Sequence, residues 1–106
     1  MKHIYEMHAD ICKTLANSKR VEIINLLSSG EKSVSWLLKK TKLLKANLSQ
    51  HLSVMRNKGI LKVRKEGLNV FYRIANPKVV KACNLMREVL FEQIKEKEGV
   101  LKKWKQ

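Results

Sequence analysis

Residues 41–72 read TKLLKANLSQHLSVMRNKGILKVRKEGLNVFY, and the order of elements in the rest of the chain can be worked out from this stretch. It predicts a short turn, a helix, and two brief strands joined by a Glu-Gly turn. In the helical part, apolar residues recur at intervals of four, four and three residues: Leu44, Leu48, Leu52 and Met55. This spacing places all four on one face of a helix, so we expect that face to be buried.

The opposite face of this predicted helix carries short or hydrogen-bonding side chains and no carboxylate. Its members are Ala46, Asn47, Gln50, Ser53 and Asn57, flanked by Lys45, Ser49 and Arg56. Amides and hydroxyls can read base edges in the major groove of DNA, small residues permit close approach, and cations contact phosphates. The pattern therefore predicts a DNA-recognition helix.

A basic hairpin is predicted directly after this helix. Residues 62–73 read KVRKEGLNVFYR, and Gly67 supplies the backbone conformation that a tight turn needs. Phe71 and Tyr72 are neighbours on the second strand, so one should be buried and the other should face outward. A recognition-type helix followed by a basic hairpin indicates a winged helix-turn-helix. The predicted fold class is therefore mainly α with a small β-hairpin.

The remaining segments complete one predicted domain over residues 1–106. A first helix is expected at 2–16, a second helix capped by Ser18, and a third helix capped by Ser33. The helix-turn-helix then spans 33–58 and the wing 60–75. Asn76 and Pro77 are a cap and a first-turn residue, and they begin a last helix that we expect to end near residue 98, before Gly99.

The first and last helices are predicted to form a dimer interface. In the last helix, Val79, Cys83, Met86 and Leu90 alternate spacings of four and three, as in a coiled-coil seam. The apolar faces of 1–16 and 77–98 are wider than the small core can cover. We therefore expect a homodimer held by these two helices.

The charge of the chain favours a polyanionic partner. Lys and Arg total 23 against 9 acidic residues, for a formal net charge of +14. Between Lys32 and Lys65 every charged residue is basic, and this block coincides with the predicted recognition helix and hairpin. Nucleic acid is the expected partner. An enzyme is not expected, because there is no glycine-rich phosphate loop, no carboxylate pair in an apolar setting and no nucleophile motif, and no cofactor is expected either.

The location we expect is the cytoplasm. The chain opens without the apolar run of a signal peptide, and no stretch approaches the ~20 apolar residues of a membrane span. Two cysteines, Cys12 and Cys83, are too few for a disulfide scaffold and suit a reducing compartment. No membrane contact is expected.

Three segments resemble the ArsR/SmtB family of winged-helix repressors. The opening LANSKRVEII at 15–24 is similar to the family's LA-x-x-x-R-x-x-I, and LSQHLSVMR at 48–56 to its recognition helix, VS-x-HL-x-x-LR. The third segment is the wing, where GIL at 59–61 and EGLNVFYR at 66–73 resemble G-L-V and EG-x-x-x-YY. The resemblance covers residues 10 to 90 in order and spacing. It implies a homodimer that binds an imperfect palindrome near a promoter and is released by a metal ion or an oxidant.

The sensor positions that the resemblance points to are mostly different here. The C-x-C motif of metal-sensing members reads Ser33-Val34-Ser35, and hydroxyls are poor ligands for soft metals. The last helix begins Asn76-Pro77-Lys78, and no His follows His51, so no metal site is expected. Redox-sensing members place one cysteine in the second helix and one in the last. Here Asn25 stands at the first of these positions and Cys83 lies in the last helix, while Cys12 lies in the first helix.

Several residues have more than one interpretation. Cys12 and Cys83 are either packed as small hydrophobes, or form a redox switch, or join His8 in a metal cluster. His51 either contacts DNA or holds the recognition helix against the core. Trp36 either packs in the core or lies partly exposed against DNA.

The predicted DNA-binding set divides by role. Base readout is assigned to Lys45, Asn47, Ser49 and Gln50, with Ala46 allowing close approach. Phosphate contact is assigned to Lys42, Arg56, Lys62, Arg64 and Lys65. His51 and Asn69 complete the set. The expected function is a sequence-specific repressor, and the alternative is a nonspecific chromatin- or RNA-associated basic protein.

Overall fold

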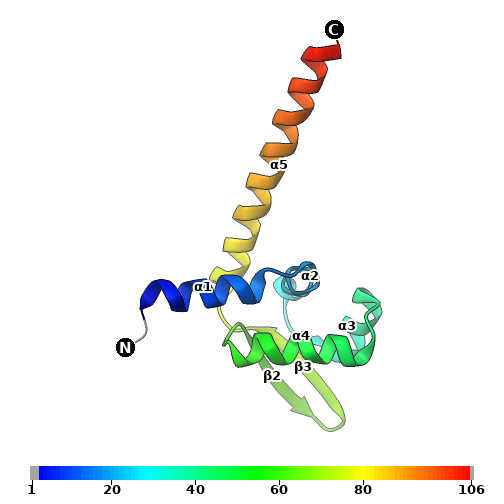
Figure 1. The fold of residues 1–106 in the computed structure, drawn as a ribbon. Helices are drawn as coiled ribbons and strands as arrows, with labels where there is room; N and C mark the ends of the chain where they lie inside the picture. Colours follow the sequence, from blue (N-terminus) through cyan, green and yellow to red (C-terminus); the bar gives the residue numbers. More distant parts are fainter. Residues whose placement is uncertain (1–2, 106) are drawn as a thin grey trace.

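The computed structural model describes residues 3–105, which form a small helical body from which one long helix projects (Figure 1). The helices are α1 (Ile4–Leu15), α2 (Ser18–Leu26), α3 (Val34–Thr41), α4 (Lys45–Asn57) and α5 (Pro77–Lys105), with a 3-10 turn at Leu27–Ser29. The strands are β1 (Lys32–Ser33), β2 (Leu61–Glu66) and β3 (Asn69–Ile74). The predicted fold class, mainly α with a small hairpin in a winged helix-turn-helix, is confirmed.

The core lies where α2, α3 and α4 meet the sheet. Ile23 and Ile24 of α2, Leu37 of α3, and Leu48, Leu52 and Met55 of α4 are essentially without solvent exposure; Leu27, Ile60, Leu61 and Tyr72 join them. Three of the four predicted α4 stripe residues are thus buried. The fourth prediction is wrong: Leu44 is the N-cap of α4, in an extended conformation outside the helix, and its side chain is 74% exposed.

The three strands form one antiparallel sheet in the order β1-β3-β2. Glu66 pairs with Asn69, so the turn consists of Gly67 and Leu68 rather than the predicted Glu-Gly pair. Gly67 has a φ of 60°, which a glycine adopts without strain. Tyr72 is buried and Phe71 partly exposed, as the alternation predicts. Strand β1 was not predicted, since two residues are too few to show an alternating pattern.

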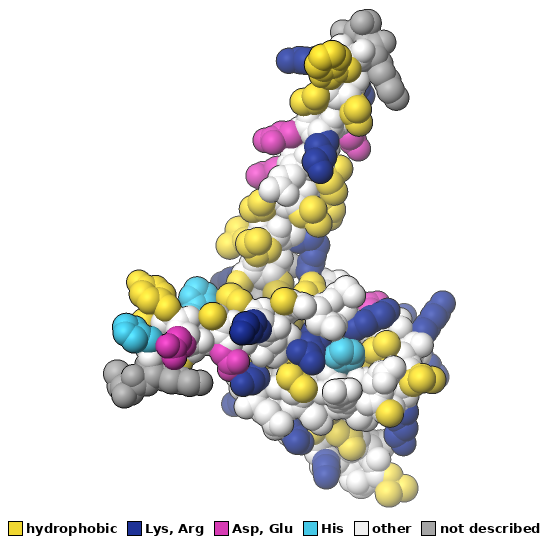
Figure 2. Space-filling view, in the orientation of Figure 1, with side chains coloured by type: hydrophobic (Ala, Val, Ile, Leu, Met, Phe, Trp, Pro, Cys, Tyr) yellow, Lys and Arg dark blue, Asp and Glu magenta, His cyan; other side chains and the backbone are white. Residues whose placement is uncertain are grey.

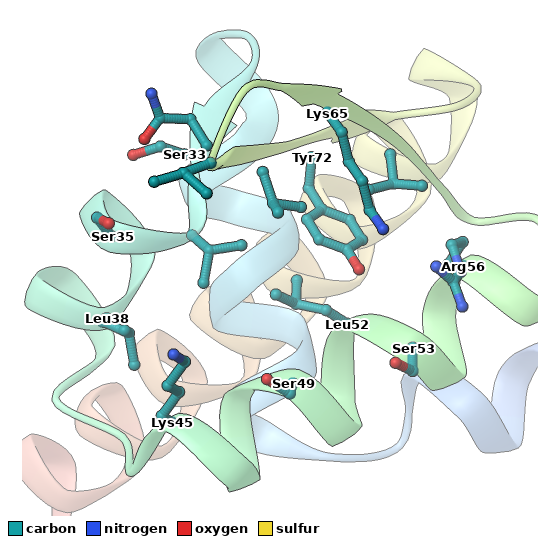
Figure 3. Close-up of a pocket in the computed structure, with 15 residues that line it drawn as sticks. Ser33, Ser35, Leu38, Lys45, Ser49, Leu52, Ser53, Arg56, Lys65 and Tyr72 are labelled. Carbon is teal, nitrogen blue, oxygen red and sulfur yellow. The ribbon is translucent and has the colours of Figure 1, made fainter.

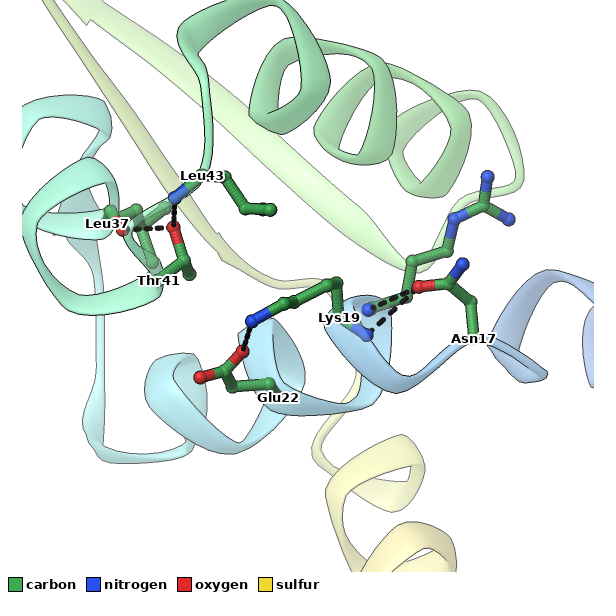
Figure 4. A network of polar contacts seen from close by, with 7 residues as sticks. Asn17, Lys19, Glu22, Leu37, Thr41 and Leu43 are labelled. Carbon is green, nitrogen blue, oxygen red and sulfur yellow. Dashed lines mark hydrogen bonds and ion pairs between the residues drawn. The ribbon is translucent and has the colours of Figure 1, made fainter.

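The turn between α3 and α4 is held by a buried threonine. The Thr41 hydroxyl donates to the Leu37 carbonyl at 2.8 Å and accepts from the Leu43 N–H at 3.4 Å (Figure 4). Lys42 follows in the left-handed conformation, with a φ of 58°. This conformation ends α3, and the next two residues lead directly into α4.

The helix starts match the predictions at two sites and differ at one. Ser33 accepts from the Trp36 N–H at 3.0 Å, and Asn76 accepts from the Lys78 N–H at 3.0 Å, so both predicted caps are present. For α2, however, the cap is Asn17 rather than Ser18. The Asn17 side chain accepts from the N–H groups of Lys19 and Arg20 (Figure 4).

Helix α5 runs seven residues further than predicted, through Gly99 to Lys105. A glycine inside a helix costs only about 1 kcal/mol relative to alanine, and good helix formers follow Gly99 here. Helix α1 begins at Ile4; positions 1, 2 and 106 of the predicted domain lie outside the described residues. Among the described residues, no helix is long and apolar enough to cross a membrane.

The Asn17 cap yields a direct test. Replacing Asn17 with alanine should lower the free energy of unfolding by about 1 kcal/mol, because two N–H groups at the start of α2 lose their acceptor. Urea unfolding followed by circular dichroism measures this loss. Ser18→Ala is the matched control and should change stability by less than Asn17→Ala; the reverse order would mean that Ser18 is the effective cap.

Candidate nucleic-acid interface

A groove runs between α3, α4 and the hairpin β2–β3, and α4 lines one side of it. Figure 3 shows Lys45, Ser49, Ser53 and Arg56 along α4, all directed toward this space. Lys65 reaches in from the hairpin, Ser35 lies on α3, and Tyr72 and Leu52 lie deeper. The groove therefore has a polar, positively charged rim over an apolar floor.

The structure brings five of the predicted site residues to this groove and leaves the others around it. Those lining it are Lys45, Ser49, Arg56, Lys65 and Asn69. Ala46, Asn47 and Gln50 are also exposed on α4, but they are not among the lining residues. Lys42 and Lys62 are exposed at the C-cap of α3 and on β2. Because α4 is buried along one face only, its remaining surface is free to meet a partner.

Arg64 lies on the hairpin but is occupied by partners within the chain. Its guanidinium donates to Glu31 at 2.6 Å and to Glu66 at 2.7 Å, and it lies 4.5 Å from the centre of the Phe71 ring. These bonds, to Glu31 first and then Glu66, raise the pKa of Arg64, and the bond from Arg64 lowers the pKa of Glu31. The contacts favour a role for Arg64 in holding β2 beside the segment before β1. The phosphate contact predicted for Arg64 is untested, and its two carboxylate partners disfavour it.

His51 is half-buried on the flank of α4 that faces α2. Its Nδ1 accepts a hydrogen bond from Arg20 Nε at 3.1 Å. Burial, and secondarily the charge of Arg20, lowers the pKa of His51 and thereby favours the neutral imidazole. This contact favours the second of the two interpretations of His51, in which it holds the recognition helix in place.

The sequence did not assign Ser35 or Leu68 to the site, and it left Trp36 open between the core and the DNA-facing surface. Ser35 lines the groove, and Leu68 sits fully exposed at the tip of the hairpin. On α3, the Trp36 ring is partly buried against the core and has the ammonium groups of Lys32 and Lys40 over it, 5.0 and 5.5 Å from its centre. Trp36 and Lys40 are four residues apart on α3, which was an available signal for their contact, whereas Lys32 lies on β1 and its contact had no helical signal.

The two cysteines differ in their surroundings. Cys12 is exposed on α1, and Cys83 is partly buried on α5, packed against the core. Burial raises the pKa of Cys83, and the nearby Arg87 opposes this only in part. Within residues 3–105, no three His, Cys, Asp or Glu side chains are grouped so that they could hold a metal ion, and His8, Cys12 and Cys83 do not form such a cluster.

The known proteins that are similar to this chain are transcriptional regulators. Residues 17–63 match the model of the bacterial regulatory protein arsR family. The uncharacterized HTH-type transcriptional regulator Rv0081 of Mycobacterium tuberculosis is 34% identical over 92% of this chain and 87% of its own length. Its crystal structure superposes with a TM-score of 0.81, at 33% identity, over 92% of this chain and 98% of that one.

Two further relatives carry descriptions of function. The transcriptional repressor PagR of Bacillus anthracis is 35% identical over 79% of this chain and 85% of its own. The homodimeric winged helix-turn-helix DNA-binding domain of Mb0332 from Mycobacterium bovis superposes with a TM-score of 0.78, at 29% identity, covering 88% of this chain and 86% of that one.

The raised pKa of Cys83 predicts a slowly reacting thiol. In a Cys12→Ser variant, iodoacetamide should modify Cys83 more slowly at pH 7.5 than it modifies free glutathione, because only the thiolate reacts. The pH–rate curve should have its midpoint above the ordinary value of 9.0 and return to it in urea. Mass spectrometry of the time course measures both. A midpoint of the pH–rate curve below 9.0 would show that the Cys83 thiol is activated and would favour the interpretation of the two cysteines as a redox switch.

Proposed function

This chain belongs to the ArsR family of bacterial transcriptional regulators, and we propose that it is a sequence-specific DNA-binding repressor that acts as a homodimer. Such a regulator works in the cytoplasm, on double-stranded DNA with an imperfect palindrome. Each subunit would place its α4 in the major groove of one half-site and its hairpin beside it. The protein would carry no enzymatic activity and no resident cofactor.

The observation that carries this proposal is the exposed face of α4. From Lys45 to Asn57 this helix presents amides, hydroxyls, a small residue and two cations, and no acidic side chain. A partner with base edges and phosphates can satisfy all of these groups, whereas an acidic residue here would repel it. We assign base readout to Lys45, Asn47, Ser49 and Gln50, with Ala46 at the closest approach.

Phosphate contact falls to the cations without an acidic partner in the chain. We assign it to Lys42, Arg56, Lys62 and Lys65, none of which has a recorded ion pair within residues 3–105. Figure 2 shows Lys and Arg side chains gathered over the body that carries α3, α4 and the hairpin. Asn69 lies at the same end of the hairpin as Lys65 and lines the groove with it.

A homodimer follows from the apolar surface that the chain leaves uncovered. Along α5, Val79 and Cys83 pack against the core, but Met86 and Leu90, the next two residues of the seam, are 69% and 50% exposed. Figure 2 shows hydrophobic side chains continuing along α5 and at the start of α1. A second copy would cover them, as patches of this extent rarely remain in water.

Release of the protein from DNA by a metal ion or an oxidant has less support than DNA binding itself. The metal-ligand positions implied by the family are occupied by Ser33 and Ser35, and burial raises the pKa of the Cys83 thiol, which disfavours the reactive thiolate. We propose that the chain lacks the usual metal sites, and that any response to oxidant would begin at the exposed Cys12.

DNA-binding measurements on two variants can distinguish base readout from phosphate contact. A duplex selected by the protein from a random pool should bind roughly 10³-fold more tightly than a scrambled duplex at physiological salt. Gln50→Ala should reduce that preference by about 1–3 kcal/mol, since a base contact is lost. Lys65→Ala should weaken both duplexes alike and lower the slope of log K against log salt by about 1. Fluorescence anisotropy measures all three.

Arg64→Ala is the matched control for Lys65→Ala, because it removes a neighbouring charge that is already paired within the chain. It should leave the salt slope at the wild-type value. Failure to select any sequence, with equal affinity for both duplexes, would contradict the specific regulator and support the chromatin- or RNA-associated alternative.

The dimer is tested on α5. Leu90→Glu should convert the dimer to monomer at micromolar concentration, because a carboxylate would be buried at the seam. Sedimentation equilibrium measures the change. Lys95→Gln alters the net charge by the same amount on the opposite side of α5 and should leave the dimer intact. A wild-type chain that sediments as a monomer up to about 100 μM, a concentration far above ordinary dimer dissociation constants, would contradict the proposed dimer.

A further inference from the structure

Arg20 joins three helices at a point away from the groove. Its Nε donates to Nδ1 of His51 on α4 at 3.1 Å, and its Nη1 donates to the Thr14 carbonyl at the end of α1, at 3.2 Å. The side chain starts from the first turn of α2, where the backbone N–H of Arg20 is held by the Asn17 cap. One guanidinium therefore connects the recognition helix to α1 and α2.

A second link connects the same part of α1 to the end of α4. Asp10 accepts from the Lys58 ammonium at 2.6 Å, and Lys58 is the C-cap of α4. The Asp10 carbonyl also accepts from the buried Thr14 hydroxyl at 2.9 Å, so the two attachment points on α1 are themselves connected. Two links that reach α4 seven residues apart restrain both its position and its rotation relative to α1.

The bond between Arg20 and His51 has a strict chemical requirement. A guanidinium can only donate, so Nδ1 of His51 must be unprotonated and the neutral ring carries its proton on Nε2. Protonation of Nδ1 would remove the acceptor and set two positive charges against each other. Arg20 is the charged group that acts on His51, while Lys19 pairs with Glu22 on α2, and Asp10 pairs with Lys58 between α1 and α4.

We propose that Arg20 is a positioning residue for DNA recognition, holding α4 at a defined orientation to α1 through neutral His51 without contacting DNA itself. The inference rests on the proposed function. Because α1 also takes part in the proposed dimer, the link would set the separation and angle of the two recognition helices. A dimer can read two half-sites at once only when their spacing matches that separation.

The experiment is a double-mutant cycle on the selected duplex. Arg20→Gln and His51→Leu should each reduce the preference for the selected over the scrambled duplex by about tenfold, since a hydrogen bond to a charged group is lost. The double variant should lose no more than either single variant. The salt slope should stay at the wild-type value in all three, because no phosphate contact is removed. Circular dichroism melting confirms that each variant is folded.

A pH series on the wild-type chain tests the same link without a destabilising variant. The wild-type preference should fall as the pH is lowered through the pKa of His51, which lies below the ordinary value of 6.5. His51→Asn keeps an acceptor close to the position of Nδ1 but does not titrate. The preference of this variant for the selected duplex should therefore be the same at every pH of the series, while that of the wild-type chain falls. Asp10→Asn probes the second link and should reduce the preference without changing the salt slope.

Three outcomes would overturn the proposal. Additive losses in the cycle would mean that Arg20 and His51 act separately. A salt slope lowered by about 1 in Arg20→Gln would make Arg20 a phosphate contact. Tighter binding at pH 5.5 that disappears in His51→Asn would mean that His51 gives its charge to DNA. A wild-type chain without any preference would instead contradict the proposed function, and the two failures are therefore distinguishable.

Discussion

The structure depends on a single constraint: α4 must be anchored by one face and free on the other. Leu48, Leu52 and Met55 are almost completely removed from water, and they pack among α2, α3 and the sheet. Burying three large side chains of this kind supplies roughly 5–9 kcal/mol before the entropy of ordering is subtracted. This burial anchors α4, while the side chains on its opposite face, such as Asn47 and Gln50, remain exposed. The exposed surface of α4 can be polar because the buried apolar face anchors the helix, and the contacts of His51 with Arg20 and of Lys58 with Asp10 add to this anchoring.

The cations of the chain also divide into a group held by contacts within the chain and a group left exposed. The chain is strongly basic, but its cations are not equivalent. Arg64 is engaged by two carboxylates and a ring, and Lys58 by Asp10, whereas Lys65 and Arg56 stand at the rim of the groove without such partners. The paired cations stabilise the hairpin and the end of α4 through contacts within the chain. The exposed cations at the rim of the groove are available to contact an external anion. Counting Lys and Arg cannot separate these two groups, because an ion pair between residues 31 and 64 is a product of folding.

The core of this small domain covers the apolar side chains of only the first turns of α5. The first turns of α5 contribute Val79, Val80 and Cys83 to the domain, but the helix then leaves the body and continues to Lys105 (Figure 1). Its exposed leucines, valines and aromatic residues have no partner among the described residues of one chain. In the proposed dimer, α1 would connect assembly to the orientation of α4, because Thr14 and Asp10 of α1 are bonded to Arg20 and to Lys58 at the end of α4.

The sequence by itself determined the class of fold and the face of α4. Spacings of three and four residues specify which side chains share a helix face, and the Asn-Pro and Gly67 signals act within a few residues, so these predictions hold. Its errors were also local: Leu44 was placed in α4 although it caps the helix, one cap and one turn were each displaced by a residue, the two-residue strand β1 was missed, and the last helix is longer than Gly99 implied. Only the tertiary structure decided which of the polar residues are free. Arg20 and His51 are 31 residues apart and Arg64 and Glu31 are 33 apart. Neither pair has a periodic signature, because contacts between distant segments are set by the packing of the helices and strands that carry them.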